Sequence, residues 1–210
     1  MEIKKPHIKK EQLNSKTITD GLLTYEIESG LINDVSFENK KIEEIKFQEV
    51  IGENISFQST ILDGLSLSDV ILKKCNFVGA KIQHLFLQRV EIENCRIQGT
   101  DCPEATLYDV VIKNSKCIGA SFRFAKFKNV AFVDCDLSDI DFTASEFKNV
   151  VFRQCNLSKA QFSQTKLQDV SIKDSTIDNI RIDKDSIKGL IVNTGQAIYL
   201  SSLFGLIVED

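Results

Sequence analysis

Residues 125–169, written in groups of five, read AKFKN VAFVD CDLSD IDFTA SEFKN VVFRQ CNLSK AQFSQ TKLQD. The third residue of every group is Phe or Leu, and the first is small, β-branched or Cys. A longer period of four groups is superimposed on this pattern, because 125–137 resembles 145–157. An internal repeat of this kind indicates an architecture of stacked units.

The same register runs through residues 22–192 without interruption. Of the 35 third positions in this span, 32 are Leu, Ile, Phe or Val, whereas the hydrophobic content of the whole chain is 42%. The position two residues earlier carries no charge in residues 50–180. Two inward positions in five match neither the 3.6-residue period of a helix nor the alternation of a strand. They indicate a chain that turns a corner every five residues.

Four groups of five make one coil and explain the longer period. A coil of this kind cannot bury its apolar side alone, but stacked neighbours bury it continuously. With coils spaced like β-strands, about 4.8 Å apart, residues 30–189 predict an eight-coil rod of about 40 Å. Outward Asn and Asp suit the corners, where they tolerate turn geometry. One repeated position is Val in seven coils: Val50, Val70, Val90, Val110, Val130, Val150 and Val170.

The cysteines follow the same repeat. Four of the six fall at one position of the coil, and Ser115 and Ser175 fill the same position in other coils. Exchange of Cys with Ser indicates a small core residue, and zinc or redox sites would need close Cys pairs or a Cys/His cluster. We therefore expect reduced thiols and no metal site. The four repeated cysteines are Cys75, Cys95, Cys135 and Cys155.

This pattern resembles the pentapeptide-repeat proteins, whose motif is a small residue, Asp or Asn, Leu or Phe, and then two polar residues. Matches include Cys-Asn-Phe at 75–77, Cys-Asp-Leu at 135–137, Ile-Asp-Phe at 140–142 and Cys-Asn-Leu at 155–157. The resemblance covers about 170 of the 210 residues. It implies an all-β fold, a right-handed quadrilateral β-helix of about eight coils with a short C-terminal helix.

Two irregularities interrupt the pattern without shifting its register. Gly52 leaves a third position empty, so we expect either Ile51 to turn inward or the coil to be kinked there. Pro103 lacks an N–H and should interrupt hydrogen bonding between coils locally. We interpret both as tolerated irregularities rather than functional features.

The ends depart from the repeat, and a β-helix needs caps on its unpaired edges. Residues 1–20 are expected to cap the first coil, so that residues 1–192 form one capped β-helix. Residues 193–210 are expected to form a helical cap that also mediates dimerisation. Thr194 is the expected N-cap of its helix and Gly205 its stop, with a short strand at 206–208.

This C-terminal segment is more apolar than one short helix needs. A cap could bury all of these side chains against the last coil, or the surplus could form a two-fold seam that joins two rods end to end. We favour the homodimer. Its candidate interface residues are Ile198, Leu200, Leu203, Phe204, Leu206 and Ile207.

Composition sets aside several classes of protein. A hydrophobic content of 42% with 27% charged residues is typical of a soluble globular chain. No apolar run approaches the ~18 residues of a membrane span. The N-terminal residues lack the apolar core of a secretory signal, which favours a cytoplasmic location. The net charge is −4 and no block of like charge occurs, so we expect no direct binding of nucleic acid.

The sequence offers no catalytic constellation. The two histidines, His7 and His84, lie far apart in any rod, and nucleophilic catalysis would need one of them beside a nucleophile. His84 occupies an outward position and is most simply a surface residue. The turn geometry of the corners already explains the Asp residues there, so they are not singled out as a catalytic acid and base. We therefore expect neither an enzyme nor a cofactor.

The end of the chain narrows the resemblance to the Qnr-like quinolone-resistance proteins, of the type without inserted loops. Residues 200–208, LSSLFGLIV, are similar to the helix and the Leu-Gly-Leu/Val-Ile-Val segment that close those chains. The similarity implies a dimeric rod that binds DNA gyrase or topoisomerase IV, imitates duplex DNA and protects the enzyme from quinolones. The alternative is a non-catalytic scaffold for an unrelated protein partner.

Partner-binding candidates come from the outward positions. Residues 30–69 carry eight acids against three lysines, whereas residues 70–189 carry 18 basic and 15 acidic residues. Phe86 and Tyr108 fall on one side of successive coils, close to Arg89 and Asp109, and a surface aromatic pair can mark a contact site. The acidic candidates are Asp34, Glu38, Glu43, Glu44, Glu49, Glu53, Asp63 and Asp69.

Overall fold

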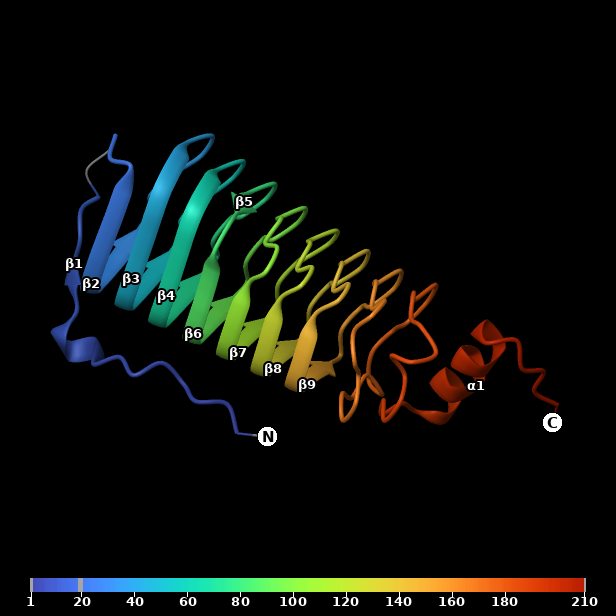
Figure 1. Cartoon of the computed structure of the whole chain (residues 1–210). Coiled ribbons are helices and arrows are strands. Elements are labelled where there is room, and N and C mark those ends of the chain that lie inside the picture. Colours follow the sequence, from blue (N-terminus) through green and yellow to red (C-terminus); the bar gives the residue numbers. More distant parts are fainter. Residues whose placement is uncertain (1, 19–20, 210) are drawn as a thin grey trace.

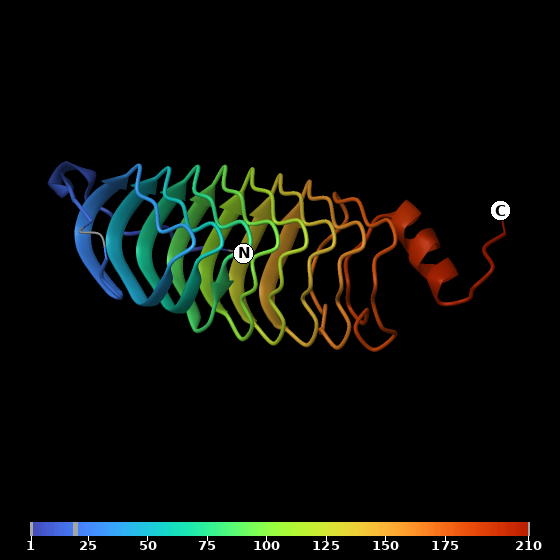
Figure 2. The same cartoon turned by 90° about the horizontal axis from the view of Figure 1, so that it is seen from above.

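The computed structural model describes residues 2–18 and 21–209, which wind into an elongated solenoid that ends in a helix (Figure 1). Successive coils follow one another along a single axis (Figure 2). A 3-10 turn at Lys10–Gln12 precedes the strands. The strands are β1 (Asn14–Ser15), β2 (Thr24–Asn33), β3 (Lys41–Glu53), β4 (Ile61–Lys73), β5 (Lys81–Ile82), β6 (Leu85–Glu93), β7 (Thr106–Lys113), β8 (Lys126–Val133) and β9 (Glu146–Arg153), and the helix is α1 (Thr194–Leu203). The predicted all-β solenoid with a short C-terminal helix is confirmed.

The strands form one parallel sheet in which each coil pairs with the next. From β2 onward each residue pairs with the one four groups of five further along, as in the pairs Val50–Val70 and Val130–Val150. Single bridges carry the same offset past β9, as far as Ser171 and Ile191. The predicted coil of four groups is therefore confirmed over this whole span.

The two inward positions of each five form a continuous core. All seven valines of the repeated position are at most 1% exposed. Phenylalanine rings stack from coil to coil, with centroids 5.1 Å apart for Phe37 and Phe57 and 4.7 Å apart for Phe57 and Phe77. The third positions at the two ends of the register are not part of the core, since Leu22 is 50% exposed and Val192 is only half-buried.

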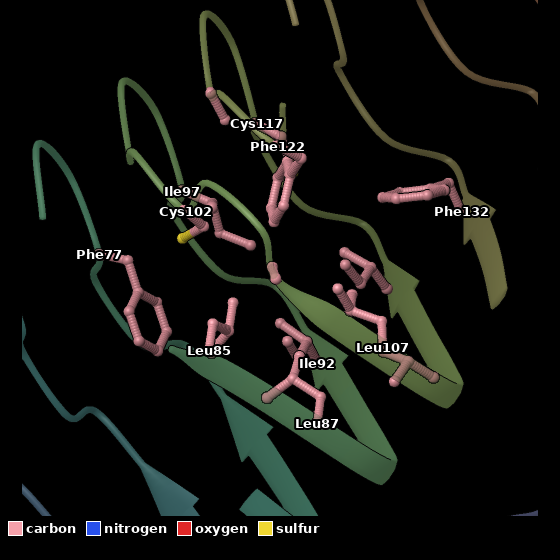
Figure 3. Packing of buried hydrophobic residues seen from close by; sticks show 14 of the residues in the cluster. Phe77, Leu85, Leu87, Ile92, Ile97, Cys102, Leu107, Cys117, Phe122 and Phe132 are labelled. Carbon is pink, nitrogen blue, oxygen red and sulfur yellow. The ribbon is translucent and has the colours of Figure 1, made fainter. Parts of the chain in front are cut away.

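The middle of the core is aliphatic as well as aromatic. Figure 3 shows Leu87, Leu107 and Phe122 among the side chains that fill the interior of neighbouring coils. Cys102 and Cys117 replace larger residues at two third positions and are also buried there. Burial raises the pKa of both thiols. These side chains are therefore packed as neutral thiols in the core.

The four repeated cysteines are free thiols inside the solenoid. The backbone N–H of Cys75 donates to Cys95 Sγ at 3.3 Å, and the N–H of Cys95 donates to Ser115 Oγ at 3.0 Å. Cys and Ser thus perform the same hydrogen-bonding role in adjacent coils. Their interpretation as small core residues agrees with this burial.

The corners of the coils are made by residues with positive φ. Asn129, Asp134 and Asp139 have φ values of 55°, 52° and 56°, and the same conformation recurs along the chain. Asn and Asp tolerate this left-handed region better than most residues. The predicted corner every five residues is confirmed at these positions.

The two irregularities are accommodated within the repeat. The expectation at Gly52 is wrong, because β3 continues through it and pairs it with Ile32 and Leu72. A Cβ atom there would lie 2.7 Å from Ile55 Cδ1 and 2.9 Å from Leu72 Cδ2, so neighbouring side chains already fill the vacancy. Ile51 stays on the outward side as a half-buried residue.

Pro103 occupies the first central position of a turn whose second central residue, Glu104, has φ 56°. Proline suits this position because its own φ is fixed near about −65°. The adjacent bonds between coils persist, from Cys102 N–H to Ser121 O and from Glu104 N–H to Arg123 O, both 2.8 Å. Any interruption is therefore confined to one residue.

α1 closes the C-terminal end of the solenoid (Figure 2). Its N-cap is Asn193 rather than the expected Thr194, and Asn193 and Gln196 form a reciprocal capping box. Gly205, with φ 81°, ends the helix as expected, and the N–H of Leu206 returns to Ser201 O at 3.0 Å. The strand expected at 206–208 is absent from this part of the described chain, because no neighbouring strand pairs with it.

Gln196 and Leu200 attach α1 to the last coil. The Gln196 side-chain amide donates to Ile172 O at 2.8 Å and to Ser175 O at 2.7 Å, and Leu200 is 7% exposed. The backbone N–H of Asn179 also donates to the Tyr199 hydroxyl at 2.7 Å. These contacts satisfy two carbonyl groups and one N–H group of the last coil, which has no further coil beside it.

The N-terminal residues have two placements. β1 pairs beside β2, and Lys16 N–H donates to Leu31 O at 2.9 Å, so this part lies on the first coil. Residues before the 3-10 turn instead run along the axis of the solenoid, across the strands and toward its middle (Figure 1). Hydrogen bonds from Lys4 to Asp109 and from His7 to Asp69 fix this course.

Candidate partner-binding surfaces

The acidic candidates of the early coils do not gather on one side of the solenoid. Glu43 and Asp63 share one column because they hold the same position in successive coils, and Glu49 and Asp69 share another. The remaining four occupy four further columns around the coil: Asp34, Glu38, Glu44 and Glu53.

Several of these carboxylates are paired with basic groups. Glu53 accepts from Lys74 at 2.7 Å, Glu44 from Lys46 at 2.9 Å, and Asp69 is bound by Arg89. The hydrogen bond from Lys74 lowers the pKa of Glu53. The early coils therefore present dispersed and partly neutralised charge, without an unbroken row like the phosphates of DNA.

Phe86 in β6 and Tyr108 in β7 lie side by side, as their positions on one side of successive coils predict. Their ring centroids lie 6.3 Å apart with an interplanar angle of 89°, which is an edge-to-face contact. Both side chains are half-buried. Their edges remain available at the surface of a rigid parallel sheet.

A hollow of about 220 Å³ adjoins this pair on the same side of the sheet. Sequence reasoning missed its lysines, although Lys128 and Lys148 pair across β8 and β9 and hence lie in one column. We call the surface formed by the aromatic pair and this hollow the lysine–aromatic face. Its residues are Phe86, Tyr108, Lys126, Phe127, Lys128, Glu146, Phe147 and Lys148.

A second surface is the corner at which each long strand bends. Asp69, Arg89, Asp109 and Asn129 follow one another there, one in each coil, all with φ between 51° and 56°. Arg89 Nε donates to Asp69 Oδ1 at 2.7 Å, and Asn129 Nδ2 donates to Asp109 Oδ1 at 3.0 Å. We call this row of residues the corner column.

Asp69 is the most buried acid of the corner column, at 7% exposure. Burial raises the pKa of its carboxyl group. The hydrogen bonds from Arg89 and from the His7 backbone lower this pKa by more than burial raises it, so the pKa lies below its usual value. Asp69 is therefore held as a carboxylate by groups from two separate segments.

The C-terminal end is the most apolar surface. Ile198, Leu203, Leu206 and Ile207 are 49%, 46%, 63% and 89% exposed. Two other predicted interface residues are placed differently, because Leu200 is buried in the core and Phe204 is half-buried. A groove of about 440 Å³ lies between α1 and the last coil, lined by Ile187, Leu190, Val192, Ala197, Leu200 and Phe204 among others.

No catalytic arrangement is assembled within residues 2–18 and 21–209. His7 lies beside Asp69, whereas His84 is an exposed residue whose Nδ1 is 3.4 Å from Asp63 Oδ1. In the same residues, no group of three or more His, Cys, Asp or Glu side chains could hold a metal ion. The described chain also has no helix long and apolar enough to cross a membrane.

Comparison with known proteins identifies the repeat. Residues 113–182 match the family model of the pentapeptide repeat region. A search of curated proteins found no match. A structure of QnrB1, described as a plasmid-mediated fluoroquinolone resistance protein, is similar at 19% identity, covering 94% of this chain and 98% of that one, with a TM-score of 0.34.

HetL, a pentapeptide repeat protein involved in heterocyst differentiation regulation in the cyanobacterium Nostoc sp. strain PCC 7120, is similar at 15% identity. The alignment covers 81% of this chain and 90% of HetL, with a TM-score of 0.30. These two neighbours have different described roles, and neither likeness assigns a function here. Residues 113–182 are a pentapeptide repeat region, and the coils on either side of it continue the same five-residue geometry.

Proposed function

We propose that this chain is a non-catalytic rod that binds DNA gyrase or topoisomerase IV and protects that enzyme from quinolones. The observation that carries a binding role is the lysine–aromatic face, where an edge-to-face aromatic pair adjoins three exposed lysines and one exposed glutamate, Glu146, on a parallel sheet. The choice of a topoisomerase follows from the similarity of residues 200–208 to the segment that closes the Qnr-like quinolone-resistance proteins. A partner of this kind implies a cytoplasmic location.

The charge distribution favours contact through the lysine–aromatic face over imitation of duplex DNA. A mimic should place negative charge in the order of DNA phosphates. The early acids instead lie in six columns, and three of them are bound by Lys or Arg side chains. Lys126, Lys128 and Lys148 would meet an acidic surface of the partner, which steers association.

A supercoiling assay with purified gyrase and ciprofloxacin tests this proposal. We expect the wild-type chain to restore supercoiling and the charge-reversed variant K126E/K128E/K148E to lose this effect. The control variant E43Q/D63N neutralises an acidic column and should behave like wild type. Loss of protection in the control with full protection by the lysine variant would favour DNA mimicry instead.

An unrelated protein partner is the second candidate, favoured by the same three lysines because an acidic surface on any protein would fit them. It predicts that the folded wild-type chain has no effect on gyrase or topoisomerase IV, either as an inhibitor or as a protector. The gyrase assay therefore separates the two candidates.

We also propose that the rod forms a homodimer through its C-terminal end. Ile198, Leu203, Leu206 and Ile207 leave an apolar surface beside the groove of α1, and a two-fold axis would cover it in both copies. Light scattering should give a dimer for wild type and a monomer for L203D/I207D. The control I118D alters an exposed apolar residue elsewhere on the rod and should leave the dimer intact. A monomeric wild type at micromolar concentration contradicts this proposal.

A further inference from the structure

The chain's own N-terminal residues lie against the corner column. Residues 2–9 belong to no helix or strand in the described structure, and they run along the axis of the solenoid, across the strands (Figure 1). We call residues 2–10 the strap. Its position is defined by backbone groups: His7 N–H donates to Asp69 Oδ1 at 2.8 Å, and Lys4 N–H donates to Asp109 Oδ1 at 3.3 Å.

The spacing of these two bonds matches an extended chain to the solenoid. Asp69 and Asp109 are two coils apart, which corresponds to about 9.6 Å at the β-strand spacing. Lys4 and His7 are three positions apart, and an extended segment of that length spans about 10 Å. Asp69 and Asp109 can therefore accept backbone N–H groups from two residues that lie three positions apart in an extended segment. This geometry depends on the backbone and not on particular side chains.

Charge and burial favour a basic segment with a few apolar residues. The strap contains four lysines and one glutamate, and it lies against the carboxylates of Asp69 and Asp109. Its lysines are exposed, whereas Ile3, Pro6 and Ile8 are half-buried. Lysine side chains thus remain in water while small apolar side chains contact the rod.

Arg89 holds the Asp69 carboxylate in position to accept a backbone N–H. It lies between the two aspartates in the column and binds Asp69 through Nε and a second guanidinium nitrogen. The carboxylate is thereby fixed before an N–H reaches it, while Asn129 fixes Asp109 in the same way. A preorganised acceptor loses less freedom when a ligand binds.

We propose that the corner column between Asp69 and Asp109 is a binding site for an extended basic segment of a partner protein, and that the strap occupies this site in the free chain. The strap is suited to displacement, since a segment without secondary structure opens at lower free energy than the coils. Tethering gives it an effective concentration of about millimolar, so a partner segment must compete with it. This inference rests on the proposed function only in that the partner is a protein.

Fluorescence anisotropy with a labelled peptide of residues 2–13 tests the site without knowledge of the partner. In the full-length variant K4P/H7P, both bonded N–H groups are removed from the strap, and we expect this chain to bind the peptide at least about tenfold more tightly than wild type. Adding D69G to that variant should abolish binding, because Gly retains positive φ but lacks the carboxylate. The matched control D134G removes an aspartate with φ 52° at another corner and should bind like K4P/H7P.

Two further peptides separate a partner site from a purely structural strap. A scrambled peptide of the same composition should bind within about threefold of the first, and a peptide with Lys replaced by Glu should not bind. Thermal unfolding verifies that each variant is folded. Failure of the folded K4P/H7P chain to bind either basic peptide overturns the proposal, as does binding of the original sequence alone. A negative gyrase assay leaves this result unaffected, so the two proposals fail independently.

Discussion

Gly52 and Gly64 occupy neighbouring coils but differ in what surrounds them. A Cβ atom at Gly52 would collide with the ends of Ile55 and Leu72, whereas at Gly64 its nearest contact is an ordinary 3.5 Å. We expect Gly52→Ala to destabilise the fold by about 1–3 kcal/mol through overpacking. Gly64→Ala should be neutral or stabilise by about 0.5 kcal/mol, because it restricts the unfolded chain. Urea denaturation measures both; equal effects would contradict the packing described at Gly52.

Phe142 and Phe124 provide a similar contrast between core and surface. Phe142 is fully buried, with ring centroids 5.4 Å from Phe162 and 5.5 Å from Phe127. Phe142→Ala should cost about 3–5 kcal/mol through lost burial and a cavity. Phe124 is 57% exposed, so Phe124→Ala should change stability by less than about 0.5 kcal/mol. A small loss for Phe142→Ala in urea denaturation would mean that the aromatic core repacks.

Asp69 should make stability depend on pH in the acidic range. Its pKa is lowered in the folded chain, so its charge stabilises the fold above the unfolded pKa of about 3.9, and this contribution is lost as the pH falls through the lower folded value. We expect wild type to exceed Asp69→Asn in melting temperature at pH 7, and the difference to shrink below about pH 4. A difference that stays constant from pH 7 to pH 3 would show that the charge of Asp69 is not involved.

At the scale of elements, α1 tests how the C-terminal end is held. Asn193 accepts the N–H of Gln196 at 2.9 Å, while Thr194 is the first helical residue and is exposed. Asn193→Ala should destabilise the chain by about 0.5–2 kcal/mol, and Thr194→Ala should have little effect. Urea denaturation or hydrogen exchange in α1 compares the two. A larger destabilisation by Thr194→Ala than by Asn193→Ala would indicate that Thr194 is the N-cap.

The elements also show where sequence reasoning stops. The helix and its stop at Gly205 could be predicted, because Gly at a helix end has a local conformational cause. The N-cap was misplaced by one residue, since Asn193 and Thr194 are both good caps and the choice depends on the reciprocal bond with Gln196. The course of the strap could not be predicted, because its contacts join residues 62 and 105 positions apart and leave no periodic signal.

At the scale of the whole molecule, periodicity determines most of the fold. A register that holds over residues 22–192 specifies which side chains point inward, and stacking then fixes the parallel pairing of each group of five with the fourth group after it. The candidate surfaces follow less directly. Phe86 and Tyr108 could be paired from their columns, whereas the dispersal of the early acids depends on ion pairs such as Lys74–Glu53 that a column does not reveal.

Direct binding of purified gyrase tests most simply whether the lysine–aromatic face is a partner-binding surface. Calorimetry or surface-based binding would compare the wild-type chain with F86A/Y108A, after thermal unfolding has shown that both are folded. We predict that wild type binds and that the variant binds at least about tenfold more weakly, because aromatic anchors dominate interface energies. Equal binding by the two chains, or no binding by the folded wild type, would show that gyrase is not bound through the lysine–aromatic face.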